Sequence, residues 1–575
     1  MIRFLAEIAF RSAVDLHPTP SPNHSRNKNI YYLDIALAPA NSYWKEKFGG
    51  TFNEYTGTQI ELYYSQFLRH VNTMDEVLTY EYTFWINPAD YKVYFNIPKH
   101  PWLYPQYEVG GEQVLPFISS ALKPDNPSHN VVRGVPAQTR LELPNFTVKL
   151  SDSISGVVLN QSFDLVLHND DGYFDNDAEW NLFNTPVHLK KAVVENPSYS
   201  DFREIRSGLA ASTSTKFDEF RISVEDKIRS LDDPVCNTIK QEDFPNYTLL
   251  ESAIGKNIPV LYGRKRIKPE KIWEEKNAAG NVIKARYMLA EYIQSCEEAY
   301  DKDGNRITGN LTLENHQVLY NTKLDADGKL IEVSEVVIRS ANFTNNAGVI
   351  KDILEKKSNI PFEETFWDIS DYYKYYGSNA PFINIIFTSG DVKKAIADIL
   401  KSDMAYFLQL SDGRFTVRRY GIIYGGHHID SSMLTQKPEK NYDYAHNNYF
   451  SSCAIKYAYT GTNKETYKTF LYDENKAAAE NKYRRKRFTE FETDIDISEG
   501  DNVRELAQLL GQRYSTMRQR IKAALAIDTT GMELLDIVTM DLTVNGRKFS
   551  NADKFIITEI NHAQDILTLE EIDYG

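Results

Sequence analysis

Apolar side chains at every second position pattern the N-terminal part of the chain. This alternation runs through residues 2–12, 163–167 and 220–224, and it is typical of β-strands with one buried face. A further pair of alternating runs flanks the turn-forming sequence Asn87-Pro88-Ala89-Asp90 and predicts a hairpin over residues 82–97. Strands spaced in this way over residues 117–245 predict a β-barrel or β-sandwich.

A short extended segment, GKNIPVLYG, follows at residues 255–263. Pro259 disfavours a helical conformation at Ile258, so the segment is expected to be extended. Gly255 and Gly263 permit sharp turns at its two ends. We therefore expect a short buried strand that leaves one β-rich module and enters the next.

Residues 270–340 are predicted to form hairpins, and the apolar period then changes. The hairpin turns are indicated by Asp-x-Asp-Gly sequences at 301 and 325 and by Asn277-Ala278-Ala279-Gly280. A period of 3.6 residues then predicts two helices on either side of a strand at residues 382–387. The first helix runs through residues 349–354, with Thr344 or Asn345 as its cap. The second runs through residues 392–400, with Ser389 as its cap.

The C-terminal part is predicted to be β-rich around one helix. Residues 406–417 form a hairpin in this prediction, and the helix covers residues 501–517, with Asp501 near its positive end. The closing strands are expected at residues 519–528, 535–544 and 555–569, joined by turns at Gly531 and at Asn545-Gly546.

These elements predict a mainly β chain with α+β insertions, containing two tube-like β-barrel or β-sandwich domains and smaller β and α+β modules. A chain of 575 residues is long enough for several domains. We expect the chain to divide into five parts. Residues 1–30 and 117–255 form the first tube-like domain, and residues 31–116 form an aromatic β-rich insertion or decoration. Residues 256–340 form a hairpin module, residues 341–404 a small α+β module, and residues 405–575 the second β domain.

The charge balance argues against general nucleic-acid binding. Asp and Glu number 80 against 65 Lys and Arg, which leaves a formal net charge of −15. Affinity for nucleic acid comes mainly from neutralising phosphates, so a chain this acidic is a poor candidate. It is compatible with an acidic wall that DNA passes without sticking.

No cofactor, metal site or catalytic signature is expected. The three cysteines, Cys236, Cys296 and Cys453, are far apart and are interpreted as reduced buried thiols. The sequence lacks G-x-S-x-G, H-E-x-x-H, Walker and G-x-G-x-x-G motifs. The N-terminus does not have the pattern of a signal peptide, and no apolar run reaches the length of a membrane span.

Two segments rich in acidic residues or histidine contain side chains that can ligate metals. The run Asn169 to Asp177 offers many oxygen ligands, but an EF-hand with Gly172 at its sixth position would begin at Leu167, where a carboxylate belongs. A strand-ending turn is therefore favoured. His427 and His428, followed by Asp430, point to opposite sides of an extended chain, so the segment is interpreted as an exposed loop.

Two basic runs are candidate interaction surfaces. The first is Arg264, Lys265 and Arg266, directly after the short strand, and the second is Arg484, Arg485, Lys486 and Arg487. Adjacent aromatic residues would also suit contacts with phosphates. In a strongly acidic chain, solvated strand faces, or surfaces that form salt bridges with an acidic partner, are the favoured uses.

Three segments, taken in order, resemble the hub proteins of phage tail tips and baseplates and of related phage tail-like particles. The first is FDLVLHNDDGYF at residues 163–174, similar to a strand and turn of the hub's first tube-like domain; residues 202–208 and 220–231 resemble that domain's next strands. The second is IPVLYG at residues 258–263, which resembles the step after that domain. The third is a helix, a strand and LLDIV at residues 534–538, similar to the family's closing domain. Structural turns are assigned to Asn169, Asp171, Gly172, Pro259, Gly263 and Asp536.

The resemblance implies a virion protein, synthesised in the host cytoplasm, that acts in assembly and carries no catalytic residues. It implies a homotrimer whose two tube-like domains per chain make a pseudo-six-fold ring, which adapts the six-fold tail tube to the three-fold tip. DNA and the end of the tape-measure protein would pass through its channel without specific binding. The implied partners are the distal tail protein ring and peripheral tail-tip or fibre proteins.

Two alternatives stay open at this point. Residues 31–116 do not match the hub pattern, and their aromatic side chains, including Trp85 and Trp102, would suit a receptor- or carbohydrate-binding tail-tip protein. The second alternative is a wall-degrading enzyme. The paired carboxylates of a glycosidase need not be close in sequence, so the sequence does not exclude such a pair. A structural protein is favoured over both.

Overall fold

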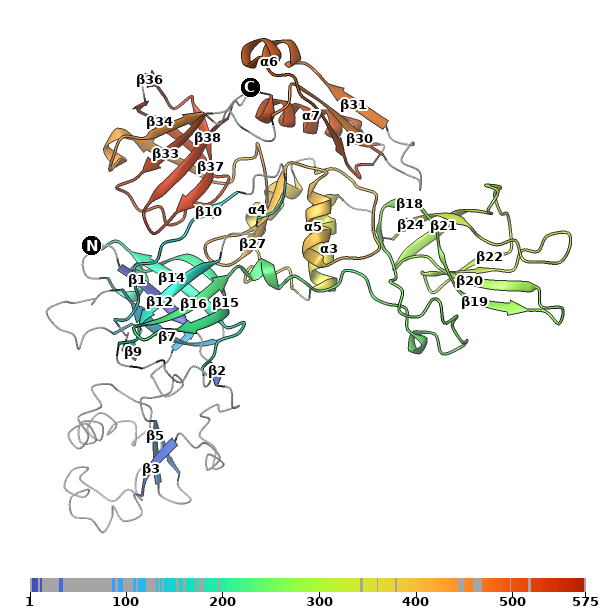
Figure 1. Ribbon diagram of the computed structural model, residues 1–575, viewed down its shortest axis with the longest axis horizontal. Helices are drawn as coiled ribbons and strands as arrows, with labels where there is room; N and C mark the ends of the chain where they lie inside the picture. Colours follow the sequence, from blue (N-terminus) through green and yellow to red (C-terminus); the bar gives the residue numbers. More distant parts are fainter. Residues whose placement is uncertain are drawn as a thin grey trace. The chain divides into compact units, whose positions relative to one another are not determined.

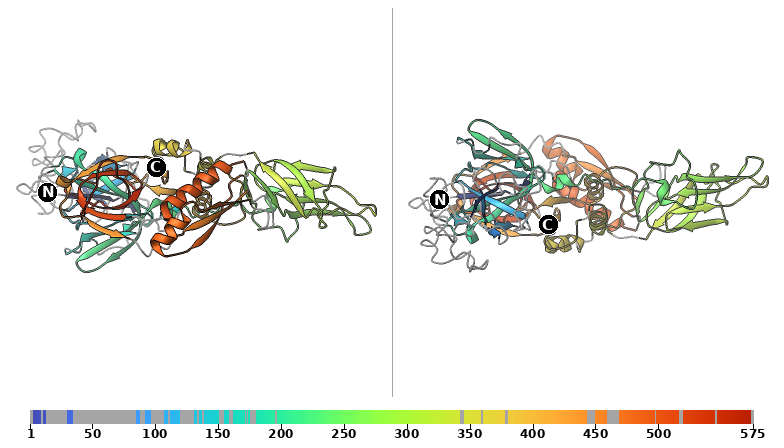
Figure 2. Two further views of the ribbon diagram at one scale, coloured as in Figure 1. Left: turned by 90° about the horizontal axis from the view of Figure 1, so that it is seen from above. Right: turned by 90° about the horizontal axis from the view of Figure 1, so that it is seen from below.

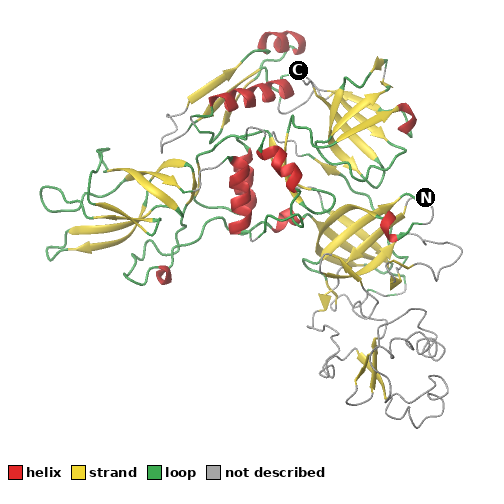
Figure 3. Ribbon diagram, turned by 180° about the vertical axis from the view of Figure 1, so that it is seen from behind, coloured by secondary structure: helices red, strands yellow, loops and turns green. Residues whose placement is uncertain are grey.

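The computed structural model shows a mainly β chain with a few helices, which confirms the predicted fold class (Figure 3). It describes residues 3–8, 11–12, 30–34, 85–87, 92–96, 107–109, 112–119, 131–132, 135–136, 139–150, 155–158, 162–170, 172, 174, 180–194, 197–341, 345–358, 360–377, 380–442, 449–458, 468–496, 498–515, 519–544 and 546–572. The chain divides into two compact units. Unit 1 comprises Met1–Phe146, Gln161–Asp226 and His562–Gln564, and unit 2 comprises Thr147–Asn160, Lys227–Asn561 and Asp565–Gly575.

Unit 1 is built on a seven-stranded antiparallel sheet in the order β12-β16-β15-β14-β1-β7-β6 (Figure 1). Its strands are β1 (Arg3–Ile8), β6 (Tyr107–Val109), β7 (Glu112–Ile118), β12 (Phe163–His168), β14 (Pro186–Ala192), β15 (Arg203–Thr215) and β16 (Glu219–Glu225). The strands predicted at 163–167 and 220–224 are confirmed. Their alternate side chains are buried, as the period of two requires.

Smaller strands complete the description of unit 1. The pairs and sheets are β2 (Arg11–Ser12) with β13 (Trp180–Asn181), β8 (Val131–Val132) with β9 (Val135–Pro136), and β3 (Ile30–Asp34), β4 (Trp85–Asn87) and β5 (Lys92–Asn96) together. Pairing of β4 with β5 confirms the hairpin predicted over residues 82–97. The turn of this hairpin, the side chain of Trp85 and all of Trp102 lie outside the described part of the chain.

Unit 2 begins with the predicted hairpins. Its strands here are β17 (Val260–Tyr262), β18 (Arg264–Ile267), β19 (Glu270–Lys276), β20 (Val282–Met288), β21 (Ile293–Tyr300), β22 (Leu311–Glu314), β23 (Val318–Asn321) and β24 (Glu335–Ser340). Apart from β17, they form one sheet in the order β18-β24-β21 and another in the order β19-β20-β23-β22. Turns lie at all three predicted positions, each with its glycine at positive φ.

The α+β part of unit 2 surrounds a buried apolar cluster. Its elements are β11 (Gly156–Val157), α3 (Asn346–Lys357), α4 (Ile369–Tyr376), β25 (Ile385–Phe387), α5 (Val392–Leu400), β26 (Ala405–Gln409) and β27 (Phe415–Arg419). Asn345 caps α3, as predicted, by accepting a hydrogen bond from Gly348 N. The predicted Ser389 cap is wrong: Asp391 caps α5 by accepting from Lys394 N, and a carboxylate also suits the positive helix end.

A three-stranded sheet with two helices follows. It contains β30 (Ser452–Tyr457), β31 (Lys468–Tyr472), β32 (Phe488–Glu492), α6 (Lys476–Tyr483) and α7 (Gly500–Tyr514). Helix α7, orange-red in Figure 2, packs against β30 and β31. The helix ends at Tyr514, earlier than the predicted residue 517, and its C-cap Ser515 donates both its backbone N–H and its hydroxyl to the Gly511 carbonyl.

The closing sheet of unit 2 has the order β28-β34-β37-β38-β33-β29, with β10 beside β37. Its strands are β10 (Val148–Lys149), β28 (Gly426–Asp430), β29 (Glu439–Tyr442), β33 (Gln519–Ala524), β34 (Ile537–Asp541), β37 (Lys554–Asn561) and β38 (Ile566–Ile572). A short pair, β35 (Thr543–Val544) and β36 (Arg547–Lys548), lies beyond β34. The run predicted as one strand at 555–569 is a hairpin of β37 and β38.

Candidate functional site

Strand β17, the short strand predicted from IPVLYG, is fully buried and pairs with β25. Gly263 follows it at φ +83°, a left-handed conformation that suits glycine. A Cβ on Gly263 would lie 2.3 Å from Asn384 Oδ1 and 2.6 Å from the Ile383 carbonyl oxygen. The glycine therefore allows the chain to press directly onto the segment before β25.

Polar contacts hold the neighbouring backbone of this junction. Asn384 Oδ1 accepts a hydrogen bond from Arg264 N at 2.7 Å, and the Gly263 carbonyl accepts from Ser340 N at 2.8 Å. The Pro259 carbonyl accepts from Glu291 N, while the Glu291 carboxylate forms a buried ion pair with Lys357 at 2.7 Å. The segment is thus a packed structural junction.

The first predicted basic surface is largely satisfied within the chain. Arg264 pairs with Glu297 at 2.6 Å, and Arg266 pairs with Glu335 at 2.5 Å. Lys265 is only 4% exposed.

Lys265 is therefore a correction to the predicted interaction surface. Its Nζ donates to Asp494 and to the Asn384 carbonyl, both at 2.7 Å. The period of two along β18 could have shown this, since Lys265 shares its face with buried Ile267.

The turn after β12 is organised by Asn169, whose side chain is buried. Its Oδ1 accepts a hydrogen bond from Phe174 N at 2.7 Å, and its carbonyl accepts from Gly172 N at 2.9 Å. Gly172 has φ +68°, and Phe174 stacks on Phe220 at 4.4 Å between ring centroids. The structure thus places Asn169 and Gly172 in a turn; Asp171 lies outside the described residues.

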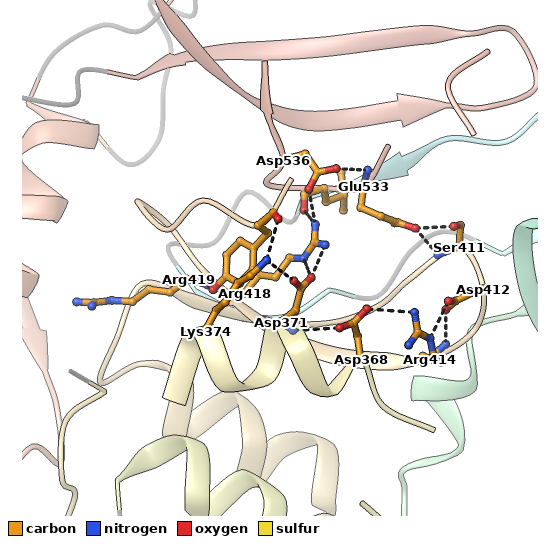
Figure 4. Close-up of polar contacts among 12 residues, drawn as sticks. Asp368, Asp371, Lys374, Ser411, Asp412, Arg414, Arg418, Arg419, Glu533 and Asp536 are labelled. Carbon is orange, nitrogen blue, oxygen red and sulfur yellow. Dashed lines mark hydrogen bonds and ion pairs between the residues drawn. The ribbon is translucent and has the colours of Figure 1, made fainter. Parts of the chain in front are cut away.

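Asp536, the residue predicted to lie in a structural turn, belongs to a buried polar network (Figure 4). Its carboxylate accepts from Arg418 Nη1 at 3.0 Å and from Glu533 N at 2.9 Å, and it lies 3.0 Å from His427 Nε2. Gly425 makes room for it, because a Cβ there would lie 2.7 Å from Asp536 Oδ1.

Arg418, at the end of β27, connects this network to α4. Its Nε donates to Asp371 Oδ2 at 2.8 Å, and its Nη1 donates to the Leu534 carbonyl at 2.7 Å. Asp371 lies in the first turn of α4 and also accepts from Lys374 at 3.3 Å. One buried guanidinium therefore holds the first turn of α4 against the segment before β34 (Figure 4).

The pKa values of two carboxyl groups in this region are shifted in opposite directions. Burial raises the pKa of Glu533 to about 7, against the opposing effects of Arg418 and the Ser411 hydrogen bonds. Burial also acts to raise the pKa of Asp536, but the His427 hydrogen bond and the Arg418 charge outweigh it, so that pKa is lowered. Asp536 is therefore charged at neutral pH, where it pairs with Arg418.

A second buried network was not anticipated. Arg513 of α7 donates to Tyr406 Oη at 2.8 Å and to Glu570 Oε1 at 3.2 Å. Its guanidinium also lies 4.6 Å from the centroid of the Tyr420 ring. These residues are distant in sequence, and the helical period marks Arg513 only by its place next to the apolar stripe of α7.

The second predicted basic surface, residues 484–487, is exposed. Arg484 ends α6 in a left-handed conformation with φ +53°. Arg485 lies over the Tyr449 ring at 5.5 Å, and Lys486 is 3.7 Å from Glu480 with 83% of its side chain exposed. The structure thus separates two runs that look alike in sequence.

The histidine pair does not lie in an exposed loop, so that interpretation is wrong. Both residues belong to β28, which pairs in parallel with β34. His427 contacts Asp536, and His428 Nδ1 lies 3.1 Å from Thr539 Oγ1, so they face opposite sides as the strand period requires. Backbone pairing across more than a hundred residues placed this segment in a sheet.

The described residues carry no group of three or more His, Cys, Asp or Glu side chains placed to hold a metal ion. Within that same part of the chain, no helix combines the length and apolar character that crossing a membrane would require. The three cysteines are free thiols, and burial raises their pKa values to about 11 for Cys236, 11 for Cys296 and 12 for Cys453.

No protein-family model and no curated protein matches the sequence. Solved structures with a similar arrangement include the tail protein from Neisseria meningitidis MC58, at 10% identity and a TM-score of 0.35 over 77% of this chain and 95% of that chain. A chain from the virion of a native gene transfer agent particle is 12% identical, with a TM-score of 0.36 over 59% of this chain and 89% of that chain. The 43 kDa tail protein of prophage MuSo2 from Shewanella oneidensis is 10% identical, with a TM-score of 0.33 over 75% of this chain and 92% of that chain. At these scores the likeness carries no argument about function.

Proposed function

We propose that this chain is a structural component of a phage or phage-like tail, and that it is the hub of the tail tip. In this role three copies form a ring that closes the six-fold tail tube or adapts it to the three-fold tip. DNA and the end of the tape-measure protein pass through the central channel. The neighbours of the ring are the distal tail protein and peripheral tail-tip or fibre proteins.

The observation that carries the proposal is the presence of two large β-sheets, one in each unit. The sheet of unit 1 has seven strands, and the closing sheet of unit 2 has six with β10 beside it. Three copies of a chain with two such sheets supply six sheets, the number that a pseudo-six-fold ring needs. A ring also offers partners to exposed strand edges, which otherwise promote aggregation.

The segments that resemble the hub family support the same proposal, because their residues make structural contacts. Asn169 fixes the turn after β12, Gly263 allows close packing after β17, and Asp536 anchors Arg418 before β34. All three are structural positions. A net charge of −15 also suits a conduit for DNA when the acidic groups face the lumen, because like charges oppose adhesion.

The proposal is tested by locating the chain in assembled particles. A short epitope inserted after Lys302, in an exposed hairpin turn, leaves the strands intact. Gold-labelled antibody in electron micrographs is expected at one end of each tail. Label along the whole tube, or particles that contain no labelled chain, would overturn the assignment.

A further inference from the structure

One exposed surface of unit 2 is basic and partly apolar, and we call it the basic surface. It consists of Leu471 on β31, Phe488 at the start of β32, and the cations of residues 484–487 between α6 and β32. Phe488 is 53% exposed although it lies in a strand. Unlike residues 264–266, of which Lys265 is buried, all four residues of this run are exposed.

Strand register shows that Leu471 and Phe488 lie on the same face of their sheet. Leu471 pairs with Ala454 and Phe488 pairs with Ser452, two positions that are two residues apart on β30. Helix α7 covers the opposite face, where Gly511 packs directly on the Tyr472 ring. The apolar pair therefore lies on the face away from α7, which it shares with Glu490, the partner of Lys456, and with Glu492.

A second exposed surface has the complementary character, and we call it the acidic aromatic surface. It consists of Glu363, Glu364 and Phe366 in the turn before α4, with Tyr373 and Tyr376 one helical turn apart on α4. Tyr373 is 57% exposed, and its ring meets the Phe362 ring edge-on at 6.2 Å. One cation also lies here, since Lys351 Nζ is 4.1 Å from the Phe362 ring centroid.

We propose that the basic surface of one copy binds the acidic aromatic surface of the next copy. Carboxylates attract the guanidinium groups, and arginine also stacks on exposed aromatic rings. A second copy is the favoured occupant because this chain itself carries the matching charge and apolar groups. Two copies with a net charge of −15 repel each other at long range, so stable contact requires such a local complement.

The contact joins two different surfaces of the same chain and is therefore heterologous. Heterologous contacts form a closed ring when the rotation between copies closes. This inference rests on the proposed trimeric hub, for which it supplies the contact between copies.

Charge reversal of each surface, followed by combination, tests the contact in the full chain. The first variant is Arg484→Glu with Lys486→Glu, and the second is Glu363→Lys with Glu364→Lys. Lys268→Glu with Lys302→Glu is the matched control, since both lysines are exposed and lie outside the two surfaces. Thermal unfolding of every variant verifies the fold, and sedimentation velocity measures self-association.

We expect each reversal to weaken self-association at least about tenfold, because like charges then face each other, while the control stays within about twofold of the unmodified chain. Combining both reversals in one chain is expected to restore self-association. An oligomer that neither reversal weakens, or no restoration in the combined chain, would overturn the contact but leave the hub intact. A chain that is monomeric at every concentration would overturn the trimer itself. Loss of duplex-DNA binding with unchanged self-association would instead identify a nucleic-acid surface and reject this proposal.

Discussion

Gly263→Ala offers the sharpest test of the junction after β17, because the chain contains a matched control. Gly263 and Gly255 have nearly the same backbone conformation, with φ +83° and +82°. They differ in the space around them. A Cβ on Gly263 would clash with Asn384 and Ile383, whereas a Cβ on Gly255 meets nothing within 4 Å.

The expected cost follows from these two differences. A left-handed conformation destabilises an L-residue by about 1–2 kcal/mol, and this applies to both variants. Forcing a methyl group into a packed site destabilises the fold by about 1–3 kcal/mol more, and this applies only to Gly263→Ala. We therefore expect a loss of about 2–5 kcal/mol for Gly263→Ala and about 1–2 kcal/mol for Gly255→Ala.

Hydrogen exchange read by mass spectrometry measures this difference locally, which suits a chain with several domains. Peptides covering β17 and β25 are compared in both variants and in the unmodified protein. Gly263→Ala is expected to accelerate their exchange roughly 5- to 150-fold more than Gly255→Ala, since 1.4 kcal/mol corresponds to a factor of ten. Equal acceleration in the two variants would refute the close packing of Gly263 on Asn384.

Further expectations concern the buried groups of unit 2. In urea titrations, Arg418→Met should lower the free energy of unfolding by about 3–5 kcal/mol, because it leaves Asp371 and Asp536 buried without their cation. Arg414→Met removes the cation of a partly exposed ion pair and should lower the free energy of unfolding by less than about 1 kcal/mol. The folded-state pKa of Glu533, about 7, lies above its ordinary value of 4.5, so its protonated form favours folding and this stability is lost as pH rises from about 4.5 through 7. Glu533→Gln should remove that part of the pH dependence in thermal unfolding curves, and an unchanged pH profile would contradict it. The buried thiols of Cys236 and Cys453 should react with a thiol reagent at pH 8 far more slowly in the native chain than in denaturant, because burial raises their pKa values; equal rates would contradict their burial.

Local patterns predicted much of the fold because they report local physics. The alternation at residues 163–167, the Asn345 cap and the glycine turns each depend on neighbouring residues, and the structure contains them all. Helices α4 and α6 were missed for an equally local reason. Half of the α4 sequence, ISDYYKYY, is tyrosine, and α6 buries only Ala479, so neither helix shows a stripe of aliphatic side chains.

The buried ion networks could not be predicted, because their members are joined only by the fold. Arg418 is 47 residues from Asp371 and 118 residues from Asp536, and no sequence period connects such positions. The resemblance singled out Asp536 as a turn residue but gave no reason for its carboxylate. The structure supplies that reason: the carboxylate neutralises a buried guanidinium.

The most direct test of the tail-tip assignment is the symmetry of this chain's density at the tip of assembled tails, determined by electron cryomicroscopy without imposed symmetry. We expect three copies around the channel, with the sheet of unit 1 and the closing sheet of unit 2 alternating in a ring of six. Six copies in the ring, or a tip without this chain, would contradict it.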